Sequence, residues 1–413
     1  MAHAEAVIYN ARQLKGQLRT AERRGKLRAL GLVAPLFLFI VISFVIPIVL
    51  MLKNAIYDPD ISNNLPRTTG LLSTWDGSAL PAEEVYAALA ADFQESEKAK
   101  TSALIGKRMN YEISAIRSKI ITSARKIKAL TAPPYKDQII AIDPIWSDIN
   151  VWTAIKRASS PITGFYLLNT VDLETKPDGH IGAVDPGRAV YLNILKRTMG
   201  ISLIVTLATL ILGFPVAYVL ANTPPRISNL LMIFVLLPFW TSLLVRTTAW
   251  FVLLQDNGPI NDFLQASGLT SHPLPLIFSR FGTIVAMTHI QLPFTLLPIY
   301  SVMKTIPPTY MRAARSLGGG PVYSFLHVYL PQTLPGIGAG CLLTFILCLG
   351  YYITPALVGG PSDQMVSGFI FDAINRENNW GKACALGSVL LFATLTLYFV
   401  YNRLVGIDKV KLG

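Results

Sequence analysis

The sequence predicts an all-α polytopic membrane protein with six transmembrane helices and a mainly helical insert between the first and the second. The 413 residues are 52% hydrophobic and have a mean hydropathy of +0.46, which is too apolar for a soluble protein with an ordinary polar surface. Six separate apolar runs reach the minimum of about 17 residues that a bilayer-spanning helix requires. The excess of basic residues lies beside those runs and outside the insert, as the positive-inside rule expects.

The first predicted elements are a basic N-terminus, residues 1–28, and an apolar run at 29–52. The N-terminus holds seven Lys and Arg residues against two Glu residues. The run is 24 residues long, which exceeds the apolar region of a cleaved signal peptide. We therefore expect an uncleaved first transmembrane helix that begins on the cytoplasmic side.

Residues 53–188 form the predicted insert, a periplasmic domain because the first helix leads outward. It holds 16 basic and 16 acidic residues, which leaves 20 basic and 8 acidic residues for the rest of the chain. The ranges 82–98 and 101–130 have helical composition, and the apolar periodicity with several Trp residues favours a packed domain over disorder. We expect the insert to contact partner proteins at the outer mouth, or only to stabilise the outer ends of the helices.

Five further apolar runs complete the predicted bundle. Alternating the sides of the membrane places Arg226, Lys304 and Arg403 on the cytoplasmic face and acids such as Asp256 and Asp363 outside. The predicted spans are 192–221, 228–254, 278–303, 332–358 and 385–401, within a five-helix core at 189–405, followed by a cytoplasmic C-terminus at 402–413.

The polar stretch 304–331 between the fourth and fifth spans has helix signals of its own. Pro307 and Pro308 end the preceding helix, Thr309 is suited to cap a new one, and Gly318 is suited to end it. Ala313 and Ala314 lie in the middle of this short helix, where small side chains allow the backbone of another protein to approach. The stretch is therefore predicted to be a docking element.

The same stretch resembles the cytoplasmic EAA loop of ABC-importer permeases. That family's pattern is Glu-Ala-Ala, three residues, Gly, nine residues, then Ile-x-Leu-Pro. Ala313, Ala314, Gly318 and the run 328–331 match it at the same spacing, and Arg312 stands where the family has Glu. The resemblance implies that the loop couples transport to an ATPase. The predicted coupling residues are Arg312, Ala313, Ala314, Leu317, Gly318, Leu330 and Pro331.

The run 237–250 resembles the third span of spermidine/putrescine-type permeases. This second resemblance covers about 190–405 and the first helix. It implies a type I ABC importer permease fold in the bacterial inner membrane, with both termini cytoplasmic. It also implies a second permease subunit, two ATP-binding subunits and a periplasmic substrate-binding protein as partners. The implied cargo is a polyamine, although related proteins carry opines, amino-acid-like compounds and aminophosphonates.

Several kinds of chemistry are excluded by the sequence. No Gly-x-x-x-x-Gly-Lys-[Ser/Thr] motif occurs, so ATP and Mg are expected to bind the partner ATPase and no cofactor is expected in this chain. The three cysteines form no metal-ligand or disulfide pattern, and the five histidines are scattered. The formal charge of +12 follows the membrane segments, which argues against nucleic acid as a partner and leaves the lipid bilayer as the predicted environment.

Ionisable and aromatic residues near the spans are the candidates for the translocation path, because charged groups are costly in lipid. Arg246 and His289 lie within spans, and Trp240 and Trp250 flank Arg246. Asp372 is an acid outside the spans that could pair with Arg246. Other readings remain open: Arg246 reaching the membrane surface, His289 as a packing residue, and the aromatic residues as an interfacial belt.

The rival functional class is a secondary transporter or channel without ATPase partners. Such a protein requires an intramembrane acid or coupling-ion site and inverted repeats. We find neither feature in the predicted spans, so the sequence favours an ATP-driven importer.

Overall fold

The computed structural model describes residues 25–26, 29–176 and 179–405. The basic residues predicted for the cytoplasmic side at positions 12–24, together with Lys409 and Lys411, lie outside the described residues. The chain divides into two compact units, Met1–Asn54 and Ala55–Gly413. The first unit contributes most of an apolar helix, Ala29–Ile56, whose most apolar window is not buried by the rest of the protein. Such a helix suits a lipid environment.

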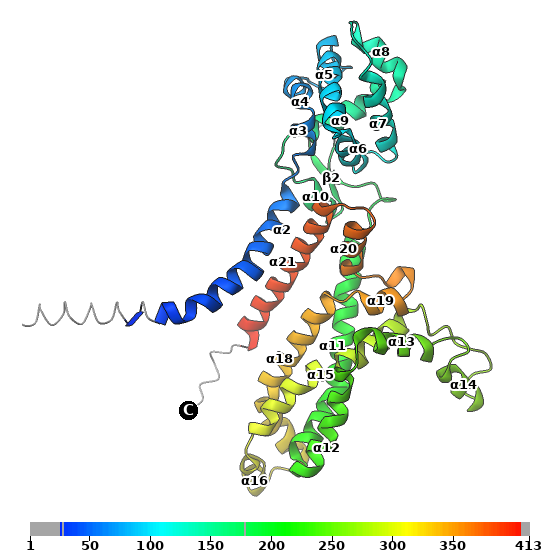
Figure 1. The fold of residues 1–413 in the computed structure, drawn as a ribbon. Helices are drawn as coiled ribbons and strands as arrows, with labels where there is room; N and C mark the ends of the chain where they lie inside the picture. The colour runs from blue at the N-terminus through cyan, green and yellow to red at the C-terminus, as the bar shows by residue number, and fades with distance from the viewer. Residues whose placement is uncertain (1–24, 27–28, 177–178, 406–413) are drawn as a thin grey trace, which may run out of the picture. The chain divides into compact units, whose positions relative to one another are not determined.

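The insert is a helical body followed by a short hairpin, and it belongs to the second unit (Figure 1). The hairpin pairs β1 and β2 antiparallel, with Glu174 opposite Gly182. The elements of the whole insert are α3 (Asp60–Asn64), α4 (Pro66–Leu72), α5 (Glu83–Ala99), α6 (Ser102–Asn110), α7 (Ile116–Ile127), α8 (Tyr135–Ile142), η2 (Pro144–Ser147), α9 (Ile149–Arg157), α10 (Phe165–Asn169), β1 (Leu173–Thr175) and β2 (Ile181–Ala183).

Aromatic side chains form the centre of the insert core. Trp146 and Trp152 are fully buried, with ring centroids 5.6 Å apart. Tyr86 packs edge-on against Trp152 at 4.8 Å and donates a 2.8 Å hydrogen bond to the carbonyl of Trp146. The two indole N–H groups also find acceptors, at 3.0 Å each. The buried polar groups of these aromatic residues are thus satisfied, as a stable core requires.

The stretch 101–130, which has helical composition, is divided into two antiparallel helices, α6 and α7. The chain reverses before Ala115, which has a left-handed φ of 63°. Gly106 allows the close packing of the pair, since a Cβ at this position would lie 2.9 Å from the carbonyl oxygen of Arg117. Composition indicates helix throughout this stretch, but it does not locate a reversal without Gly or Pro.

The insert is fastened to the first helix of the permease core by Asp172. Its carboxylate accepts hydrogen bonds from the backbone N–H groups of Val190, Tyr191 and Leu192, at 3.0, 2.9 and 2.8 Å. These are N–H groups at the start of α11 (Tyr191–Asn222), which have no partner within their own helix. A carboxylate there also favours the positive end of the helix dipole.

Three long helices, α11, α15 (Arg280–Thr305) and α18 (Leu330–Leu349), pack together as the centre of the permease core (Figure 1). A buried hydroxyl chain links them: Thr209 bonds Thr295 at 2.8 Å, and Thr295 bonds Thr344 at 2.6 Å. Gly336 and Gly340 let α18 approach α15, since a Cβ on Gly340 would lie 2.5 Å from the carbonyl oxygen of Thr295. Small residues four apart are a common means of close helix packing in membranes.

The region predicted as the span 228–254 is not one straight helix. It consists of α12 (Pro225–Leu236), η3 (Leu237–Trp240) and α13 (Leu243–Leu253), and the chain bends by 95° between Trp240 and Leu243. Pro238 lies in the short 3-10 segment, where its missing N–H and its ring disfavour a continuing α-helix. The structure therefore holds five long apolar helices in its described part, or six with this bent pair.

The span predicted at 332–358 also differs, because α18 ends at Leu349 and a separate α19 (Ile353–Val358) follows. Gly350 lies at this break as the C-cap residue of α18. The remaining helices agree with an all-α membrane fold, and the fold class predicted from the sequence is confirmed. They are α14 (Pro259–Ala266), α20 (Val366–Asn375) and α21 (Trp380–Val405), with the 3-10 turn η5 (Pro361–Asp363).

Candidate functional site

The stretch 304–331 folds as a short helix and a sharp turn between α15 and α18. Helix α16 (Pro308–Ser316) begins with Pro307 as its N-cap residue, so the prediction that Thr309 caps it is wrong. Pro308 occupies the first helical position, where its missing N–H costs no hydrogen bond. Gly318 follows the helix with a φ of +89°, a conformation that favours glycine. Pro321 then starts α17 (Pro321–Ser324), which leads through η4 (Phe325–Tyr329) into α18.

One face of this loop is held by the bundle. Tyr329 is buried, and Met311 and Phe325 pack against the same cluster, which includes Ala217 and Leu220 of α11. Phe325 also meets the ring of Tyr218, with centroids 5.6 Å apart. These contacts fix the loop on the end of the bundle where α15 ends and α18 begins (Figure 1).

The other face of the loop is exposed and partly apolar. Leu317 is 90% exposed, and Val322 and Tyr323 are 71% and 60% exposed. Arg312 and Ala313 are exposed, and Ala314 is half-buried. Farther on, Leu330 is half-buried and Pro331 exposed. Large apolar side chains gathered on an exposed loop are typical of a surface that a partner covers.

Arg312 makes no ion pair with any residue in the described ranges. Its backbone carbonyl accepts a 3.0 Å hydrogen bond from Ser316, which is a contact inside the helix. The guanidinium thus remains available to a partner.

Three of the predicted path residues come together beside the bend between α12 and α13. Trp250 donates a 3.1 Å hydrogen bond from its indole N–H to Nδ1 of His289, and their ring centroids are 5.6 Å apart. Arg246 lies in the first turn of α13, within electrostatic range of His289. Its Nε is buried and has no hydrogen-bond partner among the described residues.

Trp240 and Asp372 do not join this group. Trp240 is 91% exposed at the bend. Asp372 pairs with Arg376 of the next helical turn at 3.1 Å, so its predicted pairing with Arg246 is absent. The i, i+4 spacing on α20 supplies the aspartate with a nearer cation.

His289 also lines an open cavity of about 520 Å³ between α11, α12 and α15. The remaining lining is apolar, with Pro215, Phe234 and Pro238 among its members. An apolar hollow with one imidazole suits contact with another helix or with part of a solute more than it suits a charged ligand.

Gln291 is a candidate that the sequence reasoning missed. It lies on α15, two residues after His289, and is 1% exposed. Neither its amide oxygen nor its amide nitrogen has a partner among the described residues, and the same holds for the buried hydroxyls of Ser202 and Thr288. Buried polar groups are normally hydrogen-bonded, so each of these side chains is suited to bind water or solute. The signal in the sequence that could have indicated Gln291 is an amide side chain inside an apolar run.

Comparisons with known proteins identify the family of this chain. The family model described as "Binding-protein-dependent transport system inner membrane component" matches residues 201–407, which is half of the chain. The spermidine/putrescine transport system permease protein PotB of Escherichia coli (strain K12) is 30% identical over 226 residues, 55% of this chain and 81% of PotB.

Two further comparisons are with a second permease and with a solved transporter structure. The inner membrane ABC transporter permease protein YdcU of the same organism is 30% identical over 278 residues, covering 62% of this chain and 87% of YdcU. A crystal structure of a bacterial alginate ABC transporter, in complex with an alginate pentasaccharide-bound periplasmic protein, contains a chain with 16% identity and a TM-score of 0.44, over 52% of this chain and 77% of that one. On the family match and the similarity to PotB, this chain belongs to the inner membrane components of binding-protein-dependent transport systems.

Proposed function

We propose that this chain is the translocation subunit of an ATP-driven importer of a small polar solute, a polyamine or a related amino compound. The family assignment makes it an ABC importer permease of the inner membrane. The observation that carries the proposal further is the loop 304–331. It is anchored on one face and presents Leu317, Val322 and Tyr323 on the other.

In this proposal a nucleotide-binding subunit covers the exposed face of the loop. The short helix α16 and the left-handed Gly318 give the loop a defined shape, and Ala313 leaves room for a close approach. Arg312 then meets an acidic or polar group of that partner. ATP and Mg bind the nucleotide-binding subunit, of which two copies serve this chain and a second permease.

The proposed cargo rests on the similarity to the spermidine/putrescine permease. None of the apolar spans contains Asp or Glu, so a polycation requires attraction from elsewhere. The aromatic faces of Trp240 and Trp250 supply cation–π contacts, and a periplasmic binding protein or the second permease supplies carboxylates. Selection of the cargo is assigned mainly to that binding protein.

Two experiments test the proposal. Uptake by the assembled transporter should stop when the partner ATPase is inactivated and should be unaffected by an uncoupler of the membrane gradient. Uptake that persists with an inactive ATPase would instead favour the alternative, a secondary transporter or channel. Calorimetric titration of the cognate periplasmic protein with spermidine and putrescine tests the cargo, and binding of neither would reject the polyamine assignment.

A further inference from the structure

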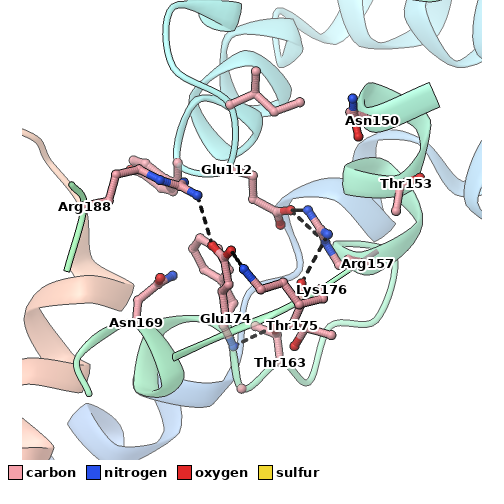
Figure 2. A pocket seen from close by; sticks show the side chains of 14 residues that line it. Glu112, Asn150, Thr153, Arg157, Thr163, Asn169, Glu174, Thr175, Lys176 and Arg188 are labelled. Carbon is pink, nitrogen blue, oxygen red and sulfur yellow. Dashed lines mark hydrogen bonds and ion pairs between the residues drawn. The ribbon is translucent and has the colours of Figure 1, made fainter. Parts of the chain in front are cut away.

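Two cavities of similar size lie next to each other, the first within the insert and the second at its border with the permease core, and they share Tyr111, Phe165 and Asn169. The first has a volume of about 430 Å³ and is shown in Figure 2, where its charged side chains are directed to one another. Because the charges are paired, this cavity has little attraction left for an ion. The pairs are Arg157 with Glu112 at 2.9 Å, Lys176 with Glu174 at 2.7 Å and Arg188 with Glu174 at 3.4 Å.

The second cavity, which we call the junction pocket, has a volume of about 450 Å³. It lies between the insert and the permease core, because α6, α7 and α10 line one side and the starts of α11 and α21 line the other. Its lining residues are Lys107, Asn110, Tyr111, Arg117, Phe165, Tyr166, Asn169, Thr170, Tyr191, Arg376, Glu377, Asn379 and Lys382.

The junction pocket is strongly basic. Lys107, Arg117, Arg376 and Lys382 line it together with one carboxylate, that of Glu377, and Asp60 lies close enough to Lys107 to interact with its charge. Lys382 pairs with Glu377 at 2.9 Å. Arg376 pairs with Asp372, as described above, so two of the four cations are already in ion pairs. Lys107 and Arg117 form no ion pair with any residue in the part of the chain that the structure describes. Two cations therefore remain for a ligand.

Neutral hydrogen-bond donors accompany these cations. The hydroxyl of Tyr111 is buried and has no hydrogen-bond partner among the described residues. The side-chain amides of Asn110 and Asn169 lie in the same lining. Several donors around two free cations match a phosphate group, whose oxygens accept multiple charge-assisted hydrogen bonds.

The place of the pocket along the helices also favours phosphate. Tyr191 is the first residue of α11 and Lys382 the third of α21, and both helices are long and apolar enough to cross a membrane. Trp380 begins α21 and is 56% exposed, in the position that tryptophan prefers at the boundary between lipid and water. We therefore expect the junction pocket to lie at the depth of phospholipid headgroups.

We propose that the junction pocket binds a phosphate group, which joins the insert to the starts of α11 and α21. The group belongs either to an anionic phospholipid or to a free phosphate, and both satisfy the same cations and donors. This inference does not depend on the transported solute or on the ATPase, because binding to the pocket is measured without transport.

The test uses the purified full chain in a detergent without phosphate. One arm follows the unfolding temperature while inorganic phosphate is titrated against chloride at equal ionic strength. The other compares nanodiscs of phosphatidylglycerol and phosphatidylcholine, and counts the phosphatidylglycerol molecules retained in native mass spectrometry. The double variant Lys107→Gln/Arg117→Gln should weaken the response by about tenfold or more, because it removes two charged donors.

The matched control is Lys119→Gln/Arg125→Gln, which removes two exposed charges of α7 outside the pocket lining. It should respond like the native chain, and Arg117→Lys should keep most of the response. A response to inorganic phosphate identifies a free phosphate, whereas a response to phosphatidylglycerol alone identifies a lipid headgroup. The proposal is overturned if the native chain responds in neither arm, or if the two double variants respond equally. Far-ultraviolet circular dichroism of each variant without ligand checks that it is folded.

Discussion

Arg108 is a buried cation held between two carboxylates of the insert. Only 2% of its side chain is exposed, and it pairs with Asp58 at 2.7 Å and with Glu112 at 3.0 Å. Burial by itself lowers the pKa of Arg108, but Glu112 and the neighbouring Tyr166 and Asp58 outweigh it and raise that pKa. The guanidinium therefore stays charged. It is the ion-pair partner of Asp58 among the described residues, whereas Glu112 also pairs with Arg157.

We predict that Arg108→Met destabilises the insert by about 3–5 kcal/mol, because it leaves the buried carboxylate of Asp58 without a cation. Thermal unfolding followed by the fluorescence of the buried Trp146 and Trp152 measures the change. Lys119→Met on the exposed side of α7 serves as the control and should leave the unfolding temperature nearly unchanged. Equal stability of the two variants would show that the buried pairs contribute no net stability.

Arg246 lies beside the bend between α12 and α13 and is our candidate for a charged residue of the translocation path. We predict that Arg246→Ala lowers uptake by about tenfold or more, since a charge-assisted contact contributes roughly 1.5–3 kcal/mol. Assembly and basal ATPase activity should persist. Arg246→Lys should recover part of the uptake if charge alone matters. Native uptake by Arg246→Ala would mean that Arg246 only reaches for the membrane surface.

Single residues were predictable from the sequence only where an apolar run made them conspicuous. Arg246 and His289 stand out in this way, and the structure places them in one group with Trp250. Asp172 was not predictable, because a carboxylate in a polar insert resembles any surface acid until the fold brings it to the start of α11. Gln291 carries no charge and was overlooked for that reason.

The coupling loop is the element on which the proposed function depends. We predict that Gly318→Trp and Ala313→Asp lower substrate-stimulated ATP hydrolysis by about tenfold or more, since a central docking contact contributes about 2 kcal/mol. No heavy atom lies within 4 Å of a Cβ built at Gly318, so the indole would project toward the partner. ATPase assays of the reconstituted complex, with and without the loaded binding protein, measure the effect.

Gly318→Asn is the control for backbone conformation, because asparagine tolerates the left-handed region and is small. It should retain most of the coupling. If Gly318→Trp and Ala313→Asp hydrolyse ATP as the native complex does, the loop is not the coupling element.

The contact between α15 and α18 depends on two glycines. Gly336 and Gly340 face Val302 and Thr295, with no room for a Cβ at either position. We predict that Gly340→Val lowers the free energy of unfolding by about 1–3 kcal/mol, the range for overpacking. It should also reduce the amount of folded protein in the membrane. Gly350→Ala is the control, because its nearest neighbour would lie at an ordinary 3.8 Å. Size-exclusion chromatography and thermal unfolding in detergent compare the two, and equal behaviour would contradict the packing argument.

At the scale of elements, hydropathy predicted the long helices and missed the breaks. The helices α11 and α15 lie within two residues of the predicted spans 192–221 and 278–303. The bend after Trp240 and the end of α18 at Leu349 fall inside continuous apolar sequence. Hydropathy reports how apolar a stretch is and contains no information on the direction of the backbone, so a residue such as Pro238 or Gly350 inside an apolar run does not by itself show that the helix breaks there.

At the scale of the whole molecule, the predicted topology places the insert and the coupling loop on opposite sides of the membrane. Lys119 in the insert and Arg312 in the loop are both exposed, so a cysteine at either position is accessible to a reagent. In a variant without the three native cysteines, an impermeant thiol reagent should label Lys119→Cys from the periplasm and Arg312→Cys only after the membrane is opened. Labelling of both from the same side would reject this topology.

The hydrogen bonds from the start of α11 to Asp172 also set an order of events during synthesis. Asp172 precedes Val190 by 18 residues, so the ribosome delivers the acceptor before the donors. The partners inside the bundle arrive much later, since Thr295 follows Thr209 by 86 residues and Thr344 follows Thr295 by another 49. Domains fold in the order in which they are made. We therefore expect the carboxylate of Asp172 to be in place when α11 is synthesised. The helices that pack against α11 are synthesised later.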